Sequence, residues 1–322
     1  MKNSATVVIP NLNGMSYLDD CLKSLAGNGS IAEVIIVDNH SADQSVEFIR
    51  RHYPDVTLIC LDENTGFAAA VNIGIKRAAT EYVILLNNDT RVEPDFAAAL
   101  IRAINSSDQI FSAGAKMLNM QKPDTIDDAG DFYCALGWAY ARGRDKAARL
   151  HNKKTYVFSA CAGAAIYRKS MMEQIGYFDE NHFAYLEDVD IGYRAQLYGY
   201  RNIYAADAVV YHAGSATSGS RYNLFKTRLT ARNSIYLIYK NMPALQIFLN
   251  LPFLIPGFLV KILFFIKKGM GQPYLQGLAE GIRLAAGRQG RLKKVRFRPE
   301  CFQYYMSIQW QLWQNTILRF FY

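Results

Sequence analysis

The sequence has few cysteines and, in its last third, almost no acidic residues. The five cysteines form no C-x-x-C pair and no regular spacing, so neither a disulfide framework nor a cysteine-ligated zinc site is predicted. No charged segment followed by a long apolar run opens the sequence, and we therefore expect no secretion signal and a reducing compartment. Apolar residues make up 51% and charged residues 20%, which excludes a disordered or collagen-like protein.

The scarcity of acidic residues divides the chain into two parts. Residues 1–215 contain 20 Lys+Arg and 26 Asp+Glu, for a net charge of −6, whereas residues 216–322 contain 16 and 2, for a net charge of +14. We therefore predict two regions, one over residues 1–215 and a basic one over residues 216–322.

Short apolar strands alternate with helical patterns in the first part. Strands are predicted at 5–9, 33–38, 56–61, 82–87 and 209–212, and helices at 17–26, 67–78, 94–104, 171–176 and 188–198. This alternation is typical of an α/β fold with a mostly parallel sheet, whose central strands are the uninterrupted apolar ones at 6–9, 34–37 and 83–86. Residues 116–154 lack periodicity and are predicted to form a long loop, and 156–168 a strand pair around Gly163.

The basic part contains one long apolar run, residues 245–266, whose only charge is Lys261. Its length would allow a membrane span, but Pro252 and Pro256 interrupt it and basic residues flank it, so we expect it to lie in the bilayer surface. Six positive charges between 288 and 298, followed by aromatic residues, favour an anionic membrane face. Nucleic-acid binding is disfavoured by the adjoining apolar run, and helices packed on the catalytic core with a solvated basic face are the alternative.

Polar residues follow three of the predicted strands, at Asp38-Asn39, at Asn64 and at Asn87-Asn88-Asp89. Ligands of α/β sheets bind beyond the carboxyl ends of the strands, so we expect these residues to meet in one nucleotide-binding crevice. An Asp carboxylate can accept the imide N–H of a pyrimidine. For each residue alone, a turn or a helix cap is the simpler interpretation.

Two further residues suit a divalent cation. Asp89 ends a strand beside any bound diphosphate, where Mg²⁺ or Mn²⁺ would use one or two carboxylates together with phosphate oxygens. His212 could add an imidazole ligand, although a simple hydrogen-bonded histidine is an equal alternative.

The segment Glu187-Asp188-Val189-Asp190 places three carboxylates at a predicted helix start. Crowded like charges raise the pKa of at least one of them, and a carboxylate that reaches a substrate hydroxyl is the form of a general base. The dipole of a helix N-terminus explains one such acid better than three.

Taken together, six ordered motifs resemble the inverting family 2 glycosyltransferases with a GT-A fold, most of all bacterial rhamnosyltransferases. The motifs are VIPNLNG at 8–14, VDN at 37–39, NTGF at 64–67 with Asn72, NND at 87–89, GYFDE at 176–180 and EDVD at 187–190. The resemblance runs over about residues 5–215. It implies a GT-A catalytic domain over residues 1–215 with a C-terminal helical, membrane-associated extension over residues 216–322.

The resemblance also implies roles for individual residues. The nucleotide sugar would be bound by Pro10, Asn13, Asp38, Asn39, Asn64, Gly66, Asn72, Asn88 and Gly163, with Asp38 recognising the base. Asp89 would bind the metal. Asp188 would be the general base that deprotonates the acceptor hydroxyl, and Glu187 would hold Asp188 in place or contact the acceptor.

The expected reaction is transfer of one sugar, L-rhamnose from dTDP-L-rhamnose, onto a polyprenyl-diphosphate-linked glycan at the cytoplasmic membrane face. A UDP-hexose or UDP-N-acetylhexosamine transferase is the nearest alternative, and a non-catalytic nucleotide-sugar-binding scaffold is another. Asn87 replaces the first aspartate of the usual D-x-D motif, and no Q-x-x-R-W motif follows residue 190, which favours single addition over processive synthesis. Arg228, Arg232 and Asn233 stand there instead and could bind a diphosphate or form a solvated helix face.

Overall fold

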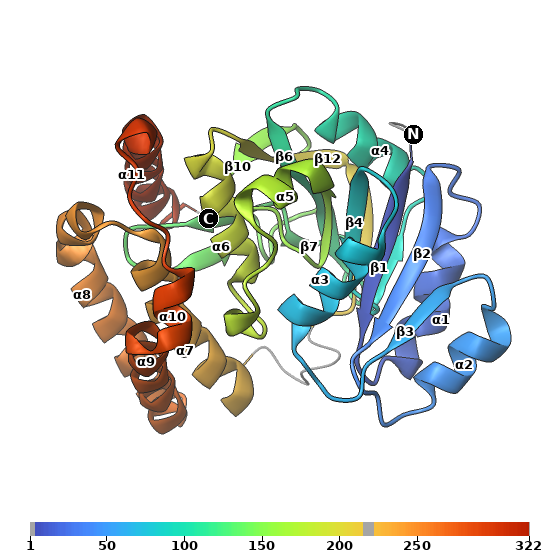
Figure 1. Cartoon of the computed structure of the whole chain (residues 1–322), viewed down its shortest axis with the longest axis horizontal. Coiled ribbons are helices and arrows are strands. Elements are labelled where there is room, and N and C mark those ends of the chain that lie inside the picture. The colour runs from blue at the N-terminus through green and yellow to red at the C-terminus, as the bar shows by residue number, and fades with distance from the viewer. Residues whose placement is uncertain (1–3, 215–221, 322) are drawn as a thin grey trace.

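The computed structural model describes residues 4–214 and 222–321 (Figure 1). The strands are β1 (Ala5–Asn11), β2 (Ile31–Asp38), β3 (Thr57–Cys60), β4 (Tyr82–Leu86), β5 (Thr90–Val92), β6 (Ile110–Asn119), β7 (Ile126–Asp128), β8 (Asp131–Tyr133), β9 (Ala139–Ala141), β10 (Thr155–Val157), β11 (Ala164–Arg168) and β12 (Arg201–His212). Helices α1 (Met15–Leu25), α2 (Ser45–His52), α3 (Phe67–Arg77), α4 (Phe96–Ile104), α5 (Lys169–Ile175) and α6 (Glu187–Leu197) connect them.

The main sheet is mixed but mostly parallel in its first half. Its strand order is β10-β12-β6-β11-β4-β1-β2-β3, with β5 paired to β12 and β7 to β6. Strands β4, β1, β2 and β3 are parallel, whereas β11 runs antiparallel between β4 and β6. The α/β prediction is confirmed, and so is the central position of the apolar strands, because β1 lies between β2 and β4.

Both faces of the sheet are covered by helices, as the uninterrupted apolar strands predict. Alternate residues of β1 enter two different cores: Val7 and Ile9 pack with α1 and α4, whereas Val8 packs with α3, α5 and α6. Parallel strands buried on both faces need apolar side chains at every position. This packing brings the carboxyl ends of β1, β2 and β4 to one edge of the sheet.

The structure corrects two predictions about the middle of the chain. Residues 116–154 are not one long loop, because they contain the end of β6 and the short strands β7, β8 and β9, and residues 126–130 are buried. The two strands around Gly163 exist but do not pair with each other: β10 pairs with β12, and β11 pairs with β4 and β6. The three-residue strands β7, β8 and β9 are too short for a period of two to stand out in the sequence.

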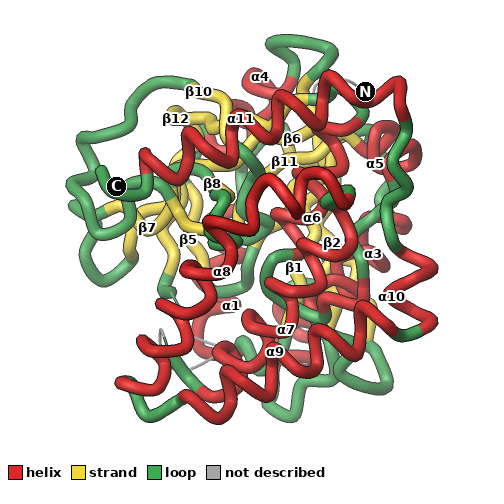
Figure 2. The backbone as a smooth tube through the Cα atoms, turned by 90° about the vertical axis from the view of Figure 1, so that its left-hand side faces the viewer, coloured by secondary structure: helices red, strands yellow, loops and turns green. Residues whose placement is uncertain are grey.

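Five helices follow residue 222 and form a layer beside the sheet (Figure 2). They are α7 (Leu224–Asn241), α8 (Ala244–Lys267), α9 (Gly271–Ala286), α10 (Arg288–Lys293) and α11 (Phe302–Leu318). Asn223 caps α7 by accepting a hydrogen bond from the Lys226 amide at 2.8 Å. A separate apolar core, which includes Tyr193 of α6, Leu254 of α8 and Leu312 of α11, joins this layer to the rest of the molecule.

Helix α8 is a continuous 24-residue helix in which Pro252 and Pro256 lie without ending it. By length and composition it could cross a membrane, and 17% of its most apolar window is buried. Its buried residues are Gln246, Asn250, Leu254, Gly257 and Phe265. They form one stripe along the helix, and the opposite face carries exposed leucine, isoleucine and phenylalanine side chains.

Candidate active site

A chain of side-chain hydrogen bonds joins the carboxyl ends of β1, β2 and β4. Asn88 donates to Asn11 at 2.7 Å, Asn11 donates to Asp38 at 2.7 Å, and Ser41 donates to the same Asp38 oxygen at 2.6 Å. Gly14 allows this close approach, because a Cβ there would lie 2.1 Å from the Asn88 amide nitrogen. Asp38 and Asn88 thus belong to one buried network, and Asn11, which the sequence motifs did not single out, connects them.

A second group of predicted residues holds the loop that follows β3. Asn39 donates to Asn64 at 2.9 Å and to the Gly66 carbonyl at 3.2 Å. Gly66 starts α3 with a φ of +84°, and a Cβ there would lie 2.5 Å from the Phe183 ring, so only glycine fits. The Asn72 side chain does not bond to this loop. It donates to the Phe178 carbonyl at 2.9 Å and to Glu180 at 2.9 Å.

The remaining predicted donor-binding residues occupy the same edge of the sheet. Pro10 lies in β1 opposite Val37, and the exposed Asn13 accepts a hydrogen bond from the Ala42 amide at 2.8 Å. Gly163 precedes β11, and its carbonyl accepts a hydrogen bond from the Asn87 amide at 2.8 Å.

Asp89 and His212 lie side by side because Thr90 of β5 pairs with His212 of β12. His212 Nε2 is 3.3 Å from Asp89 Oδ1, and His212 Nδ1 is 2.7 Å from Asp127 Oδ2. Burial lowers the pKa of His212, but hydrogen bonds to Asp127 and Asp89 outweigh it and raise that pKa to about 9. Asp127 in turn pairs with Arg144 at 2.7 Å.

This arrangement fits a divalent cation. A carboxylate and an imidazole face each other, and Asp127 holds the other ring nitrogen, which is how proteins orient a metal-binding histidine. Asn87 contributes only an amide at the first position of the motif, 3.5 Å from His212 Nε2. Asp89 could supply one ligand and His212 a second once its Nε2 has released the proton that the raised pKa retains, and a diphosphate would supply others.

Asp188 occupies the first turn of α6, next to the buried Glu187. Burial raises the pKa of both carboxyls, and the neighbouring Asp188 charge raises that of Glu187 further. The Asp188 side chain also accepts a hydrogen bond from the Ala162 backbone. A carboxylate with a raised pKa at the edge of a site has the character of a general base.

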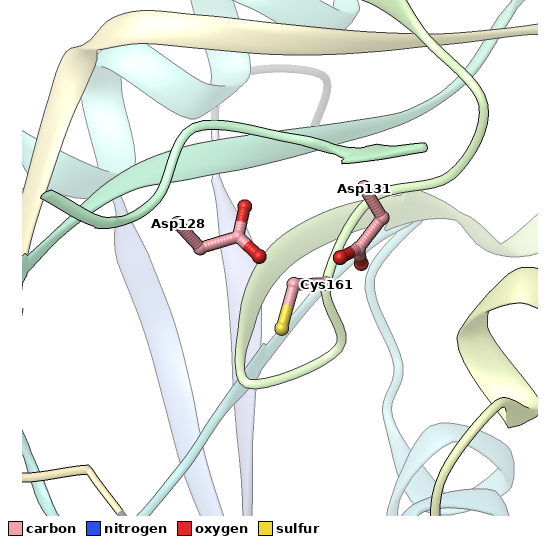
Figure 3. A group of neighbouring side chains, drawn as sticks. All are labelled: Asp128, Asp131 and Cys161. Atoms are coloured by element: carbon pink, nitrogen blue, oxygen red, sulfur yellow. The ribbon is translucent and has the colours of Figure 1, made fainter. Parts of the chain in front are cut away.

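Two carboxyls and one thiol lie close to Asp188. The ligand atoms of Asp128, Asp131 and Cys161 lie within 4.8 Å of one another, and their side chains point toward each other (Figure 3). Burial raises the pKa of Asp128 to about 6 and that of Asp131 well above its usual range. The negative charge of Asp188 also raises the pKa of Asp131, so the two carboxyls lie close together.

The segment from Asp127 to Asp131 thus connects the two halves of the site, because it contacts His212 at one end and Asp188 at the other. The sequence motifs missed it, since the segment carries no periodicity. Its only signal was the concentration of acids in an otherwise irregular stretch.

The three residues of α7 that the sequence offered as diphosphate ligands, Arg228, Arg232 and Asn233, have different surroundings. Arg228 forms an ion pair with Glu280 at the surface. Arg232 and Asn233 instead donate hydrogen bonds to backbone carbonyls between Asn181 and Tyr185. Neither the diphosphate-binding nor the solvated-face interpretation describes these two residues.

The mixed sheet, its acidic carboxyl edge and the helices on both faces have the arrangement of a GT-A fold. A model of the family described as "Glycosyl transferase family 2" matches residues 6–176, just over half of the chain. The chain belongs to this family of glycosyltransferases. The match ends at Gly176, before Asp188.

Two curated relatives show the range of activities among similar proteins. An N-acetylglucosaminyl-diphospho-decaprenol L-rhamnosyltransferase of Mycobacterium tuberculosis is 25% identical over 211 residues, which cover 58% of this chain and 68% of the relative. The low-salt glycan biosynthesis hexosyltransferase Agl10 of Haloferax volcanii is 25% identical over 307 residues, covering 91% and 95%.

Among solved structures, GalNAc-T7 with UDP, GalNAc and Mn²⁺ superposes with a TM-score of 0.60 at 16% identity. The alignment covers 74% of this chain and 48% of that one, so the chain spans about half the length of GalNAc-T7. At this identity the likeness concerns the fold, and it confirms the GT-A prediction.

Proposed function

We propose that the chain is an inverting glycosyltransferase that moves one L-rhamnose from dTDP-L-rhamnose to a hydroxyl of a polyprenyl-diphosphate-linked glycan. The observation that carries the reaction type is the segment Asp127–Asp131, which connects the Asp89–His212 pair to Asp188. A leaving diphosphate and a nucleophilic hydroxyl need sites of these two kinds within one crevice. The mycobacterial rhamnosyltransferase supports both the donor and the lipid-linked acceptor.

In this reaction Asp188 accepts the proton of the acceptor hydroxyl while the hydroxyl oxygen bonds to the anomeric carbon. The bond between that carbon and the diphosphate oxygen breaks at the same time, and the configuration inverts. Glu187 keeps Asp188 at the start of α6. A divalent cation, Mg²⁺ or Mn²⁺, held by Asp89 and His212 Nε2 would stabilise the charge of the leaving diphosphate.

On the donor side, Asp38 accepts the imide N–H of the base in addition to its hydrogen bonds from Asn11 and Ser41. The Asn39–Asn64–Gly66 loop supports the nucleotide. A UDP-hexose transferase is the second candidate. The hexosyltransferase of Haloferax volcanii favours it because that similarity extends over nearly the whole of both chains. An Asp carboxylate accepts the imide N–H of uracil as well as that of thymine.

The proposal places the enzyme on the cytoplasmic membrane face, with α8 lying on the bilayer surface. The exposed face of α8 carries Leu245, Phe248, Leu251, Ile255, Leu259, Leu263 and Ile266. Its other face is held by the protein along its length: Asn250 and Gln309 of α11 exchange two hydrogen bonds, and Trp138 donates to the Gly257 carbonyl at 3.1 Å. A helix crossing the bilayer would lose these partners.

The test is nucleoside diphosphate release from dTDP-, UDP- and GDP-sugars, with and without Mn²⁺, in the presence of extracted lipid-linked acceptors. Metal-dependent release from dTDP-rhamnose alone is the expected result. Release from a UDP-sugar instead would replace the donor and retain the mechanism. Tight nucleotide binding without release from any sugar would contradict the proposal and favour a binding protein.

A further inference from the structure

The backbone that leads into Asp188 has an unusual conformation. Phe183, Tyr185 and Leu186 have φ values of 62°, 69° and 68°, in the left-handed region that residues with side chains avoid. None of the three is a glycine. Such a segment keeps its shape only when its surroundings hold it, and strained backbone of this kind concentrates at functional sites.

Helix α7 supplies most of the hydrogen bonds that hold this segment. Asn233 is fully buried, and the two N–H groups of its amide are shared among three carbonyls, those of His182 at 2.9 Å, Ala184 at 2.8 Å and Tyr185 at 2.7 Å. Arg232 donates to the carbonyls of Asn181 and His182, both at 2.8 Å. Arg232 also donates to the Asn233 side-chain oxygen at 3.0 Å, so the two side chains fix each other.

The same face of α7 continues the contact on both sides of the strained segment. Tyr236 donates to Asp179 at 2.9 Å, and Lys240 pairs with Asp179 at 2.7 Å and with Asp190 at 2.8 Å. Residues four and eight positions after Arg232 share its helix face. Helix α7 thus contacts the chain both before and after Asp188.

A close helix contact supports α7 from behind. A Cβ on Gly277 of α9 would lie 2.1 Å from the Arg228 carbonyl oxygen, and one on Gly281 would lie 2.4 Å from that of Arg232. The two helix backbones therefore pack tightly, and α7 has little freedom to move away from the segment. From the other side, the Ala68 amide of α3 donates to the Phe183 carbonyl at 3.0 Å.

We propose that Arg232 and Asn233 are positioning residues, which hold the left-handed backbone of residues 183–186 so that Asp188 points at the acceptor hydroxyl. This inference rests on the proposed role of Asp188 as general base. It assigns to the basic C-terminal part a direct function in the chemical step. The backbone carbonyls of residues 181–185 need hydrogen-bond donors, and the Asn233 amide and the Arg232 guanidinium supply them.

The experiment compares Asn233→Ala and Arg232→Lys with matched controls on the same helix. Ser234→Ala is the control for Asn233, because the Ser234 hydroxyl bonds only to its own helix at the Thr230 carbonyl. Arg228→Met is the control for Arg232, because Arg228 pairs with Glu280 and not with the segment. We expect kcat to fall about 100-fold in the two test variants and to stay within about twofold in the controls.

Two further readouts separate positioning from a loss of folding. Binding of UDP and dTDP, measured by calorimetry, is expected to stay unchanged, and the acid limb of the kcat–pH profile is expected to move. Hydrogen exchange of the amides at 183–188 is expected to become faster in the test variants only. Unchanged kcat and unchanged exchange in Asn233→Ala and Arg232→Lys would overturn the inference, as would lost nucleotide binding alongside general unfolding.

Asp188→Asn, assayed in parallel, distinguishes this failure from a failure of the proposed function. If Asp188→Asn keeps wild-type turnover, the general-base assignment is wrong and the inference falls with it. If Asp188→Asn loses turnover while Asn233→Ala keeps it, the reaction stands and the positioning role alone is refuted.

Discussion

Residues 4–214 and 222–321 differ in both charge and exposed surface. The first part is net acidic and buries its carboxylates at the edge of a sheet, whereas the second is strongly basic and exposes large apolar side chains on α8, α9 and α11. The two parts nevertheless share buried ion pairs, since Lys240 of α7 lies between Asp179 and Asp190. The change in charge near residue 215 is therefore not a boundary in packing, because side chains from both parts form one buried network.

The C-terminal helices have an inner face, which contacts the rest of the protein, and an outer, exposed face. Inner-face residues such as Asn233 and Lys240 contact the backbone and acids around Asp188. Outer-face residues such as Phe248 and Leu263 have no such contact, with 68% and 66% of their surfaces exposed. Variants on the two faces should therefore affect different properties.

The largest effect on stability is expected from Lys240→Met. This change leaves Asp179 and Asp190 as buried carboxylates with one cation fewer, and breaking a buried ion pair in this way costs about 3–5 kcal/mol. The free energy of unfolding, measured by urea denaturation, should fall accordingly. Lys293→Met, at an exposed position, is the control. Equal stability of both variants would show that the two parts are not joined through this network.

A smaller loss is expected from Asn250→Leu, which tests the attachment of α8. Gln309 would then keep a buried amide without its partner, at a cost of about 1–3 kcal/mol. The double variant Asn250→Leu/Gln309→Leu should recover part of this loss, because two apolar groups replace the pair. No recovery in urea denaturation would indicate that α8 and α11 are held together mainly by other contacts.

Asp128→Asn should stabilise the protein in a pH-dependent way. The folded pKa of about 6 lies above the usual 3.8 because of burial, so the folded state binds this proton more tightly than the unfolded state. The contribution of Asp128 to stability therefore decreases as the pH rises from about 4 to about 6. The variant should gain up to about 3 kcal/mol at pH 8 and little at pH 4. A gain that is equal at both pH values would contradict this cause.

The smallest effect on stability, within about 0.5 kcal/mol, is expected from the double variant Phe248→Glu/Leu263→Glu on the outer face of α8. Its binding to anionic vesicles in a flotation assay should nevertheless fall at least about tenfold. Two apolar side chains that enter the bilayer are replaced by negative charges, which anionic lipid repels. Leu150→Glu, an exposed leucine of the first part, should bind like the wild type. Wild-type flotation of the α8 variant would refute the proposed docking face.

Much of the fold could be predicted from the sequence, because β1, β2 and β4 each contain a run of consecutive apolar residues and helical patterns separate them. The sequence suggested that Asp89 and His212 could bind one metal, but it did not show how their strands pair. Their contact depends on the pairing of β5 with β12, two strands far apart in the sequence. No local pattern in the sequence reports this long-range pairing.

Other features of the site depend on packing that no local pattern reports. Asp127, Asp128 and Asp131 lie in short strands and turns without periodicity. The role of Asn233 emerges only from the carbonyls that face it across α7, since a helix sequence does not tell what its polar residues contact. Motifs thus predicted more of the residues that meet at the carboxyl ends of β1, β2 and β4 than of those around Asp188.

The central claim is that Asp188 acts as the general base of sugar transfer, and turnover of Asp188→Asn tests it most directly. Nucleoside diphosphate release with donor and acceptor should fall about 100- to 10,000-fold, while donor affinity measured by calorimetry stays unchanged. This split between turnover and binding is the predicted result, because a base acts in the chemical step. Undiminished turnover of Asp188→Asn would contradict the account.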